Sequence, residues 1–124
     1  MIKELIVLLT LAINTPIVID GDTIKSGGVL IRLTDYNTPE MGAPCPRERA
    51  LAARARLELQ SLLPRLRFEL RTCATQNYGR LCMEGFLKTD EGDEIPLAYH
   101  MVTQGFAEPY ICSANHCPKR RSWC

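Results

Sequence analysis

Acidic, amide and arginine side chains recur in this chain at a spacing that suits phosphodiester hydrolysis. Asp20 and Asp22 flank a glycine, and Arg32 and the stretch 37–40 (Asn-Thr-Pro-Glu) follow one strand's length later. A strand of that length would return both stretches to one end of a small sheet. Carboxylate and amide oxygens bind hard cations, an arginine holds a phosphate, and a glutamate can activate water. We therefore predict a metal-dependent phosphodiesterase site at this end of the sheet.

A third stretch, residues 78–80, adds Tyr78 and a second arginine, Arg80, to the candidate site. Each stretch also has a simpler interpretation when it is taken alone. The aspartates around a glycine are typical turn formers, and Arg32 could be an ion-pair partner on a strand. The hydrolytic interpretation depends on all the stretches occurring together and in this order.

The charge of the chain is small overall but uneven along the sequence. The 124 residues suit one domain, and the formal net charge of +1 gives no global attraction for nucleic acid. Residues 41–72 carry seven arginines against three glutamates, whereas residues 84–108 carry six acids against one lysine. A basic stretch, residues 119–121, follows near the end. This asymmetry would steer a polyanion to one side, although such charges often only solvate a surface.

Six cysteines are many for so short a chain, and their even number suits disulfides. About fifteen complete pairings are possible, and the sequence does not choose among them. Three of the six crowd the last thirteen residues, which predicts a tail held by bridges and an extracytoplasmic (secreted or periplasmic) location. The cysteines are Cys45, Cys73, Cys82, Cys112, Cys117 and Cys124.

Residues 1–15 hold an apolar run that has two interpretations. The run fits the core of a signal peptide and is too short to span a bilayer. It equally fits a first, buried β-strand. We predict no stable membrane association beyond this segment, and we expect a monomer.

The order of the expected elements gives the fold class. Residues 16–19, 22–25 and 29–34 alternate as strands, and the Asp-Gly pair at 20–21 is a hairpin signal because such turns need positive φ. A loop covers 35–44, a helix runs from Pro46 to Leu63, and strands cover 66–72 and 81–87. A second helix begins at Pro96 and ends at Gly105. Five strands with a helix after the third predict a mainly β, α+β fold, a small and partly open barrel of the oligonucleotide-binding kind.

These segments together resemble the staphylococcal nuclease-type (thermonuclease) family. The matching residues are 18–24 (VIDGDTI), 31–33 with 37–40, the helix beginning near Glu48, 78–80 (YGR) and 104–107 (QGFA). The resemblance covers residues 16–110 as a nuclease domain and leaves 111–124 as a cysteine-rich tail. It implies a five-stranded barrel and a calcium-dependent nuclease on DNA and RNA that leaves 3′-phosphate ends.

By the same resemblance, Asp22 is a calcium ligand, Asn37 stands at the second ligand position, and Thr38 gives its backbone carbonyl. Asp20 lies beside the metal and supports its ligands. Asn37 departs from the family, which has an acid there. An amide oxygen brings no charge, and calcium affinity follows ligand charge, so we expect weaker calcium binding.

The resemblance also assigns the groups that act on the substrate. Glu40 would be the general base, and Arg32 and Arg80 would hold the scissile phosphate. Tyr78 would touch a phosphate or base of the bound strand. A carboxylate next to a cation stays ionised at neutral pH, which suits Glu40 as a base.

Two functions of other classes stay open at this point. The same barrel could bind single-stranded nucleic acid with little turnover, because Asn37 weakens the metal. The chain could also be a disulfide-held extracellular domain with a protein partner. Zinc at Cys112, His116 and Cys117 is disfavoured because the spacing has no paired C-x-x-C. His100 is expected to be a surface or core histidine without a catalytic role.

Overall fold

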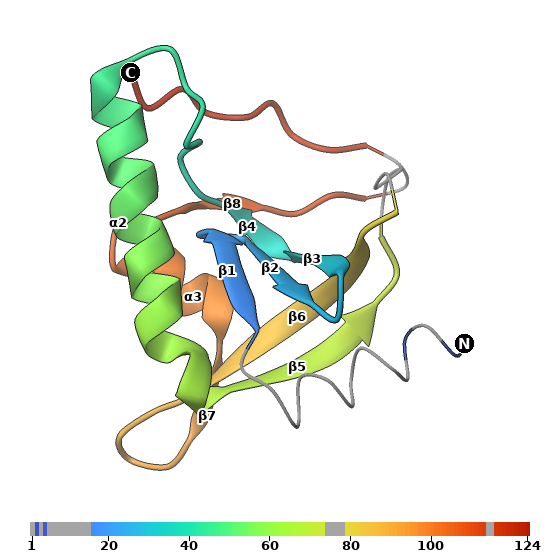
Figure 1. Cartoon of the computed structure of the whole chain (residues 1–124). Helices are drawn as coiled ribbons and strands as arrows, with labels where there is room; N and C mark the ends of the chain where they lie inside the picture. Colours follow the sequence, from blue (N-terminus) through green and yellow to red (C-terminus); the bar gives the residue numbers. More distant parts are fainter. Residues whose placement is uncertain (1, 3, 5–15, 74–78, 114–115) are drawn as a thin grey trace.

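The computed structural model describes residues 2, 4, 16–73, 79–113 and 116–124. Two helices, a short 3₁₀ turn and two sheets account for its regular structure (Figure 1). The elements are, in chain order, β1 (Ile17–Asp20), β2 (Thr23–Ser26), β3 (Val29–Leu33), β4 (Asp35–Asn37), α2 (Pro46–Leu62), η1 (Leu63–Arg65), β5 (Leu66–Arg71), β6 (Leu81–Lys88), β7 (Glu94–Pro96), α3 (Leu97–Thr103) and β8 (Glu108–Tyr110).

The larger sheet has the strand order β1-β2-β3-β6-β5, and β7 pairs with β6 beside this path. The pair β3–β6 is parallel, with Ile31 opposite Leu81, and the other pairs are antiparallel. The α+β class and the two helices are confirmed. We predicted a partly open, five-stranded barrel, whereas the larger sheet has six strands and does not close, because β1 and β5 are the two ends of its path within the described residues. The pairing of β1 with β2 is irregular between Val18 and Asp20.

Helix α2 follows from local sequence signals. Cys45 is its N-cap, and the Cys45 sulfur accepts the Glu48 N–H at 3.4 Å. Pro46 occupies the first turn, where a missing N–H costs nothing. Buried Ala52, Ala55, Leu59 and Leu62 recur at helical spacing on one face. The neighbouring Leu51 is only half-buried, although leucine is the more apolar residue.

The core lies between the larger sheet and the two helices. Strand residues Ile24, Ile31, Leu33 and Met83 are fully buried, as the alternation of β2, β3 and β6 requires. Leu59 of α2 and the α3 residues Leu97 and Met101 close the other side of this core. Gly105 ends α3 with φ +83°, as predicted from the sequence.

Gly21 has a different purpose from the one predicted. We expected positive φ at the Asp-Gly turn, but the φ of Gly21 lies outside the left-handed region. A Cβ on Gly21 would instead lie 2.6 Å from Thr38 Cγ2 and 2.9 Å from Ala55 Cβ. The glycine therefore allows the β1–β2 turn to lie directly against helix α2 and the loop that follows β4.

Two predicted irregular segments contain short strands. Residues 35–44 were expected to be a loop and the chain after Gly105 an irregular tail. Instead, β4 and β8 form a two-stranded antiparallel sheet in which Asn37 lies opposite Glu108. Strands of three residues, one of them containing Pro109, carry too little alternation to be predicted.

Three disulfides connect the chain: Cys45–Cys124, Cys73–Cys82 and Cys112–Cys117. Figure 1 shows the tail after β8 returning to the N-terminal end of α2, where Cys124 joins Cys45. Three disulfides in a chain of this size fit an extracytoplasmic location.

The signal-peptide or strand prediction for residues 1–15 falls almost entirely outside the described residues. Within those that are described, no helix has the length and apolar character needed to cross a membrane.

Candidate functional site

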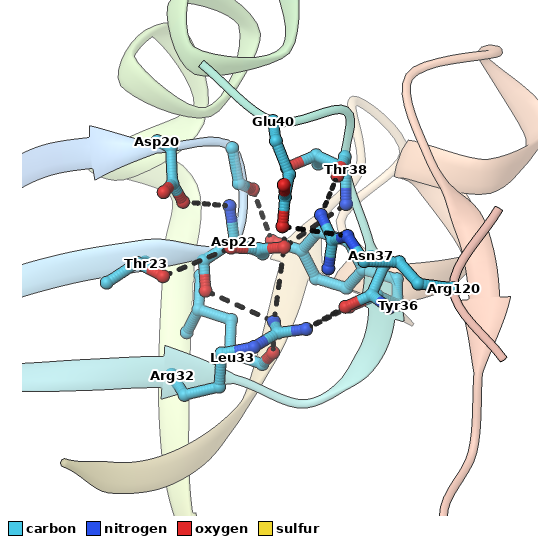
Figure 2. A network of polar contacts seen from close by, with 11 residues as sticks. Asp20, Asp22, Thr23, Arg32, Leu33, Tyr36, Asn37, Thr38, Glu40 and Arg120 are labelled. Carbon is cyan, nitrogen blue, oxygen red and sulfur yellow. Dashed lines mark hydrogen bonds and ion pairs between the residues drawn. The ribbon is translucent and has the colours of Figure 1, made fainter. Parts of the chain in front are cut away.

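A cleft of about 710 Å³ opens where the β1–β2 turn, the end of β3, β4 and the tail meet. Every predicted site residue that the structure describes lines this cleft; Tyr78 falls outside the described residues. Figure 2 shows Asp20, Asp22, Arg32, Glu40 and Arg120 close together in one network of polar contacts. The residues in question are Asp20, Asp22, Arg32, Asn37, Thr38, Glu40 and Arg80.

Asp22 is the centre of the polar network, and its carboxylate is buried. Its Oδ2 accepts the Thr38 N–H at 3.1 Å and the Thr38 hydroxyl at 3.3 Å, while its Oδ1 accepts the Thr23 hydroxyl at 3.0 Å. Arg32 Nη1 lies 3.5 Å from Oδ2. Burial by itself would raise the pKa of Asp22, but the charge of Arg32 and these hydrogen bonds lower it. Asp22 is therefore a carboxylate at neutral pH.

Asp20 lies next to this carboxylate and titrates very differently. Its Oδ1 accepts the Asp22 N–H at 3.3 Å. Burial, followed by the hydrogen bond and charge of the Asp22 carboxyl, raises the pKa of Asp20 to about 7. Near neutral pH Asp20 is therefore partly protonated, beside the ionised Asp22.

Arg32 is committed to the protein around it. Nη1 donates to the backbone carbonyls of Leu33 and, at 3.3 Å, Asp22; Nη2 donates to the Tyr36 carbonyl at 3.0 Å and to Asn37 Oδ1. These contacts involve both terminal nitrogens, and the side chain is 17% exposed. In this arrangement Arg32 holds the β3–β4 segment in shape, and a phosphate would compete with these acceptors.

The oxygens near Asp22 fit a hard cation by their chemistry. The Asp22 carboxylate, Asn37 Oδ1 and the Thr38 carbonyl are the kinds of ligand that calcium takes. This set of ligands carries little charge. In the described parts of the chain, no three His, Cys, Asp or Glu side chains gather into a metal-binding group. Asn37 Oδ1 accepts a hydrogen bond from Arg32, and the buried Nδ2 of Asn37 has no hydrogen-bond partner among the described residues.

Glu40 faces a third arginine that the sequence did not point to. Arg120 Nε lies 3.0 Å from Glu40 Oε1, and Arg120 Nη2 donates to the Thr38 carbonyl at 2.6 Å (Figure 2). Arg120 comes from the tail, 82 positions after Thr38. The sequence could have indicated this position of Arg120 only through the disulfide between Cys45 and Cys124. That disulfide belongs to only some of the possible cysteine pairings.

Glu48 was predicted only as the start of a helix, yet it connects three parts of the site. Its Oε2 accepts the Glu40 N–H at 2.9 Å, and its Oε1 accepts the Trp123 N–H at 3.0 Å. The Glu40 hydrogen bond, and less strongly that of Trp123 and the charge of Arg120, lower the pKa of Glu48 against the effect of burial. The available signal was a glutamate three residues after a helix N-cap.

Neither a protein-family model nor a curated protein matches this chain. The cleft combines an ionised buried aspartate, a more exposed glutamate and arginines from four separate segments. That combination can hold a phosphate group, accept a proton from water and bind a hard cation.

Proposed function

We propose that this chain is a nuclease of the staphylococcal nuclease type that hydrolyses phosphodiester bonds of DNA or RNA. The observation that carries the proposal is that Asp22, Arg32, Glu40 and Arg80, from separate parts of the chain, line one cleft. The strand path β1-β2-β3-β6-β5 with one parallel pair supports a fold of the oligonucleotide-binding type. The disulfides support action in a secreted or periplasmic setting.

Glu40 is the general base of this proposal. Its side chain is 56% exposed, so water can reach the carboxylate. Its backbone is fixed by Glu48, which limits the directions the carboxylate can take. Glu40 takes a proton from the attacking water as the water oxygen bonds to phosphorus and the bond to the departing 5′ oxygen breaks. The 5′ oxygen takes a proton from solvent water, so the products are a 3′-phosphate and a 5′-hydroxyl.

The arginines hold the phosphate and stabilise the charge that develops on its oxygens. Arg80 lines the cleft from the segment just before β6. Bidentate guanidinium contacts strengthen as negative charge grows in the transition state. Arg32 contributes after releasing part of its present hydrogen bonds.

Calcium is the cofactor we propose, with Asp22, Asn37 and the Thr38 carbonyl as its ligands and Asp20 supporting Asp22. When bound, such an ion neutralises phosphate charge and favours ionised water nearby. The donor oxygens and the ionised state of Asp22 support this choice.

A second function is favoured by Arg32 and Asn37. Both terminal nitrogens of Arg32 contact protein oxygens, and Asn37 adds no charge for a metal. These features support a chain that binds single-stranded nucleic acid and cleaves it poorly.

Digestion of plasmid DNA and of RNA, with calcium and with a calcium chelator, separates the two functions. We expect chelator-sensitive cleavage with 3′-phosphate ends. Glu40→Gln should lower the rate about a hundred- to ten-thousand-fold, because it removes the base, while oligonucleotide affinity stays unchanged. Glu91→Gln, an exposed acid outside the cleft, is the control. Binding without cleavage by the wild type supports the second function, and full activity of Glu40→Gln contradicts the base assignment.

A further inference from the structure

The guanidinium of Arg120 occupies the oxygens that a divalent cation would need. Its Nη2 donates to the Thr38 carbonyl at 2.6 Å, and its Nε pairs with Glu40 at 3.0 Å. The Thr38 carbonyl is one of the oxygens we propose as calcium ligands, and Glu40 is the nearby base. The Thr38 carbonyl and Glu40 therefore already contact a cationic group of the protein itself.

A second cation at the same oxygens would meet strong repulsion. Calcium at the Thr38 carbonyl would lie within a few ångströms of the guanidinium, where unit charges still interact appreciably at protein-like dielectric. The Asp22 and Glu40 carboxylates do not remove this conflict, since Asp22 is already paired with Arg32 and Glu40 with Arg120. Calcium can bind fully only when Arg120 withdraws.

The tail keeps Arg120 close to these oxygens. Cys124 is bonded to Cys45 at the start of α2, and the Trp123 N–H is held by Glu48. A tethered group competes at a high effective concentration, because it does not diffuse away when it lets go.

We propose that Arg120 and a divalent cation compete for the Thr38 carbonyl and Glu40, so that the disulfide-held tail sets the affinity of the cleft for the cation. This inference rests on the proposed function only in taking these oxygens as the cation site. It gives Arg120 a role in cation binding, in addition to the structural role of the tail's disulfides.

Calcium titration by calorimetry, without nucleic acid, tests the competition on the full, oxidised chain. Arg120→Gln should bind calcium about tenfold more tightly than the wild type, since it loses the competing charge. Lys119→Gln is the matched control, because it makes the same charge change one position away at an exposed residue that does not line the cleft. Its calcium affinity should stay within about twofold of the wild type.

Nuclear magnetic resonance of arginine side chains gives a direct second readout. The Nε–H signal of Arg120, identified by its loss in Arg120→Gln, should move as calcium saturates the wild type. Each of four results overturns the proposal: unchanged or weaker binding by Arg120→Gln, an equal gain in Lys119→Gln, an unmoved Nε–H signal, or no calcium binding by any variant.

The proposed nuclease activity fails separately. If the wild type shows this competition but cleaves neither DNA nor RNA, the nuclease proposal is wrong and the proposed competition stands. If the wild type cleaves with calcium but Arg120→Gln binds calcium no more tightly than the wild type, only the proposed competition is wrong.

Discussion

Two carboxylates of the cleft each face a guanidinium, Asp22 with Arg32 and Glu40 with Arg120. Each residue is therefore half of a pair, and removing one member leaves the other charge to find a new partner. Substitutions in the cleft should be judged by the charge they leave behind as much as by the group they remove.

Asn37→Asp restores a charged oxygen at the second proposed ligand position. We expect about tenfold tighter calcium binding, because affinity rises with ligand charge. The measurement is calorimetric titration, accompanied by the calcium concentration that gives half-maximal cleavage. Unchanged affinity would mean that the side chain of Asn37 is not a ligand, which its present hydrogen bond to Arg32 would explain.

Glu48→Gln tests the residue that joins the Glu40 loop to the tail. Its lowered pKa means that its stabilisation is complete above its unfolded pKa and is lost as pH falls through the folded value. The variant should lose about 2 kcal/mol of unfolding free energy at neutral pH, because two backbone N–H groups lose a charged acceptor.

Urea unfolding at pH 7 and at pH 3 measures this difference. The gap between the wild type and Glu48→Gln should narrow in acid, because the stabilisation by the Glu48 carboxylate is lost as pH falls through its lowered folded pKa. Glu91→Gln, an exposed acid, should match the wild type at both values. A gap that is equally large at pH 3 would show that packing, and not charge, makes Glu48 important.

The sequence predicted single site residues unevenly. Asp20, Asp22 and Glu40 could be assigned to the candidate site from the sequence, because binding a hard cation and accepting a proton both need acidic side chains. These acids lie before and after one strand, β3. Arg120 could not, because its place depends on a disulfide between distant cysteines. Glu48 looked like an ordinary first-turn acid, and only the structure shows that its carboxylate binds two other segments.

Among the elements, the β1–β2 turn, the loop after β4 and helix α2 meet at Gly21. The close contacts at this glycine leave no room for a side chain, since the nearest atoms belong to Thr38 and Ala55. The turn that carries Asp22 is therefore positioned by direct contact with the helix and with the segment that carries Thr38.

Gly21→Ala should destabilise the fold by about 1–3 kcal/mol, because the added methyl group forces packed neighbours apart. Thermal or urea unfolding measures the loss. Gly42→Ala is the control, since a Cβ there meets nothing within 4 Å and φ needs no glycine. Equal effects of the two substitutions would contradict the packing explanation.

Element prediction succeeded where periodicity was strong. Strands β2, β3 and β6 alternate over several residues, and α2 carries a stripe with Pro46 at its start. The short strands β4 and β8 were missed because each is defined mainly by its partner, 71 or more positions away in the chain. Openness of the larger sheet likewise depends on which edges meet, and local sequence does not encode it.

For the whole molecule, the bridge Cys45–Cys124 closes a loop with a sequence separation of 79. Replacing both cysteines by serine should cost roughly 4 kcal/mol, because a long loop loses much entropy on closure in the unfolded chain. Serine at 45 keeps an N-cap for α2. The matched replacement of Cys112 and Cys117, separated by 5, should cost roughly half as much. Equal losses in urea unfolding would contradict this entropic account.

The parallel junction of β3 with β6 has a consequence for how the chain matures. Ile31 and Leu81 meet there across fifty positions, whereas β1–β2–β3 and β5–β6 are each built from neighbouring strands. Long-range strand pairs of this kind form slowly, because the chain loses conformational entropy in closing the long loop before the new contacts stabilise it. Since Arg32 lies on one side of the junction and Arg80 borders the other, these two arginines come together around the cleft of a newly made polypeptide only once this late pairing is complete.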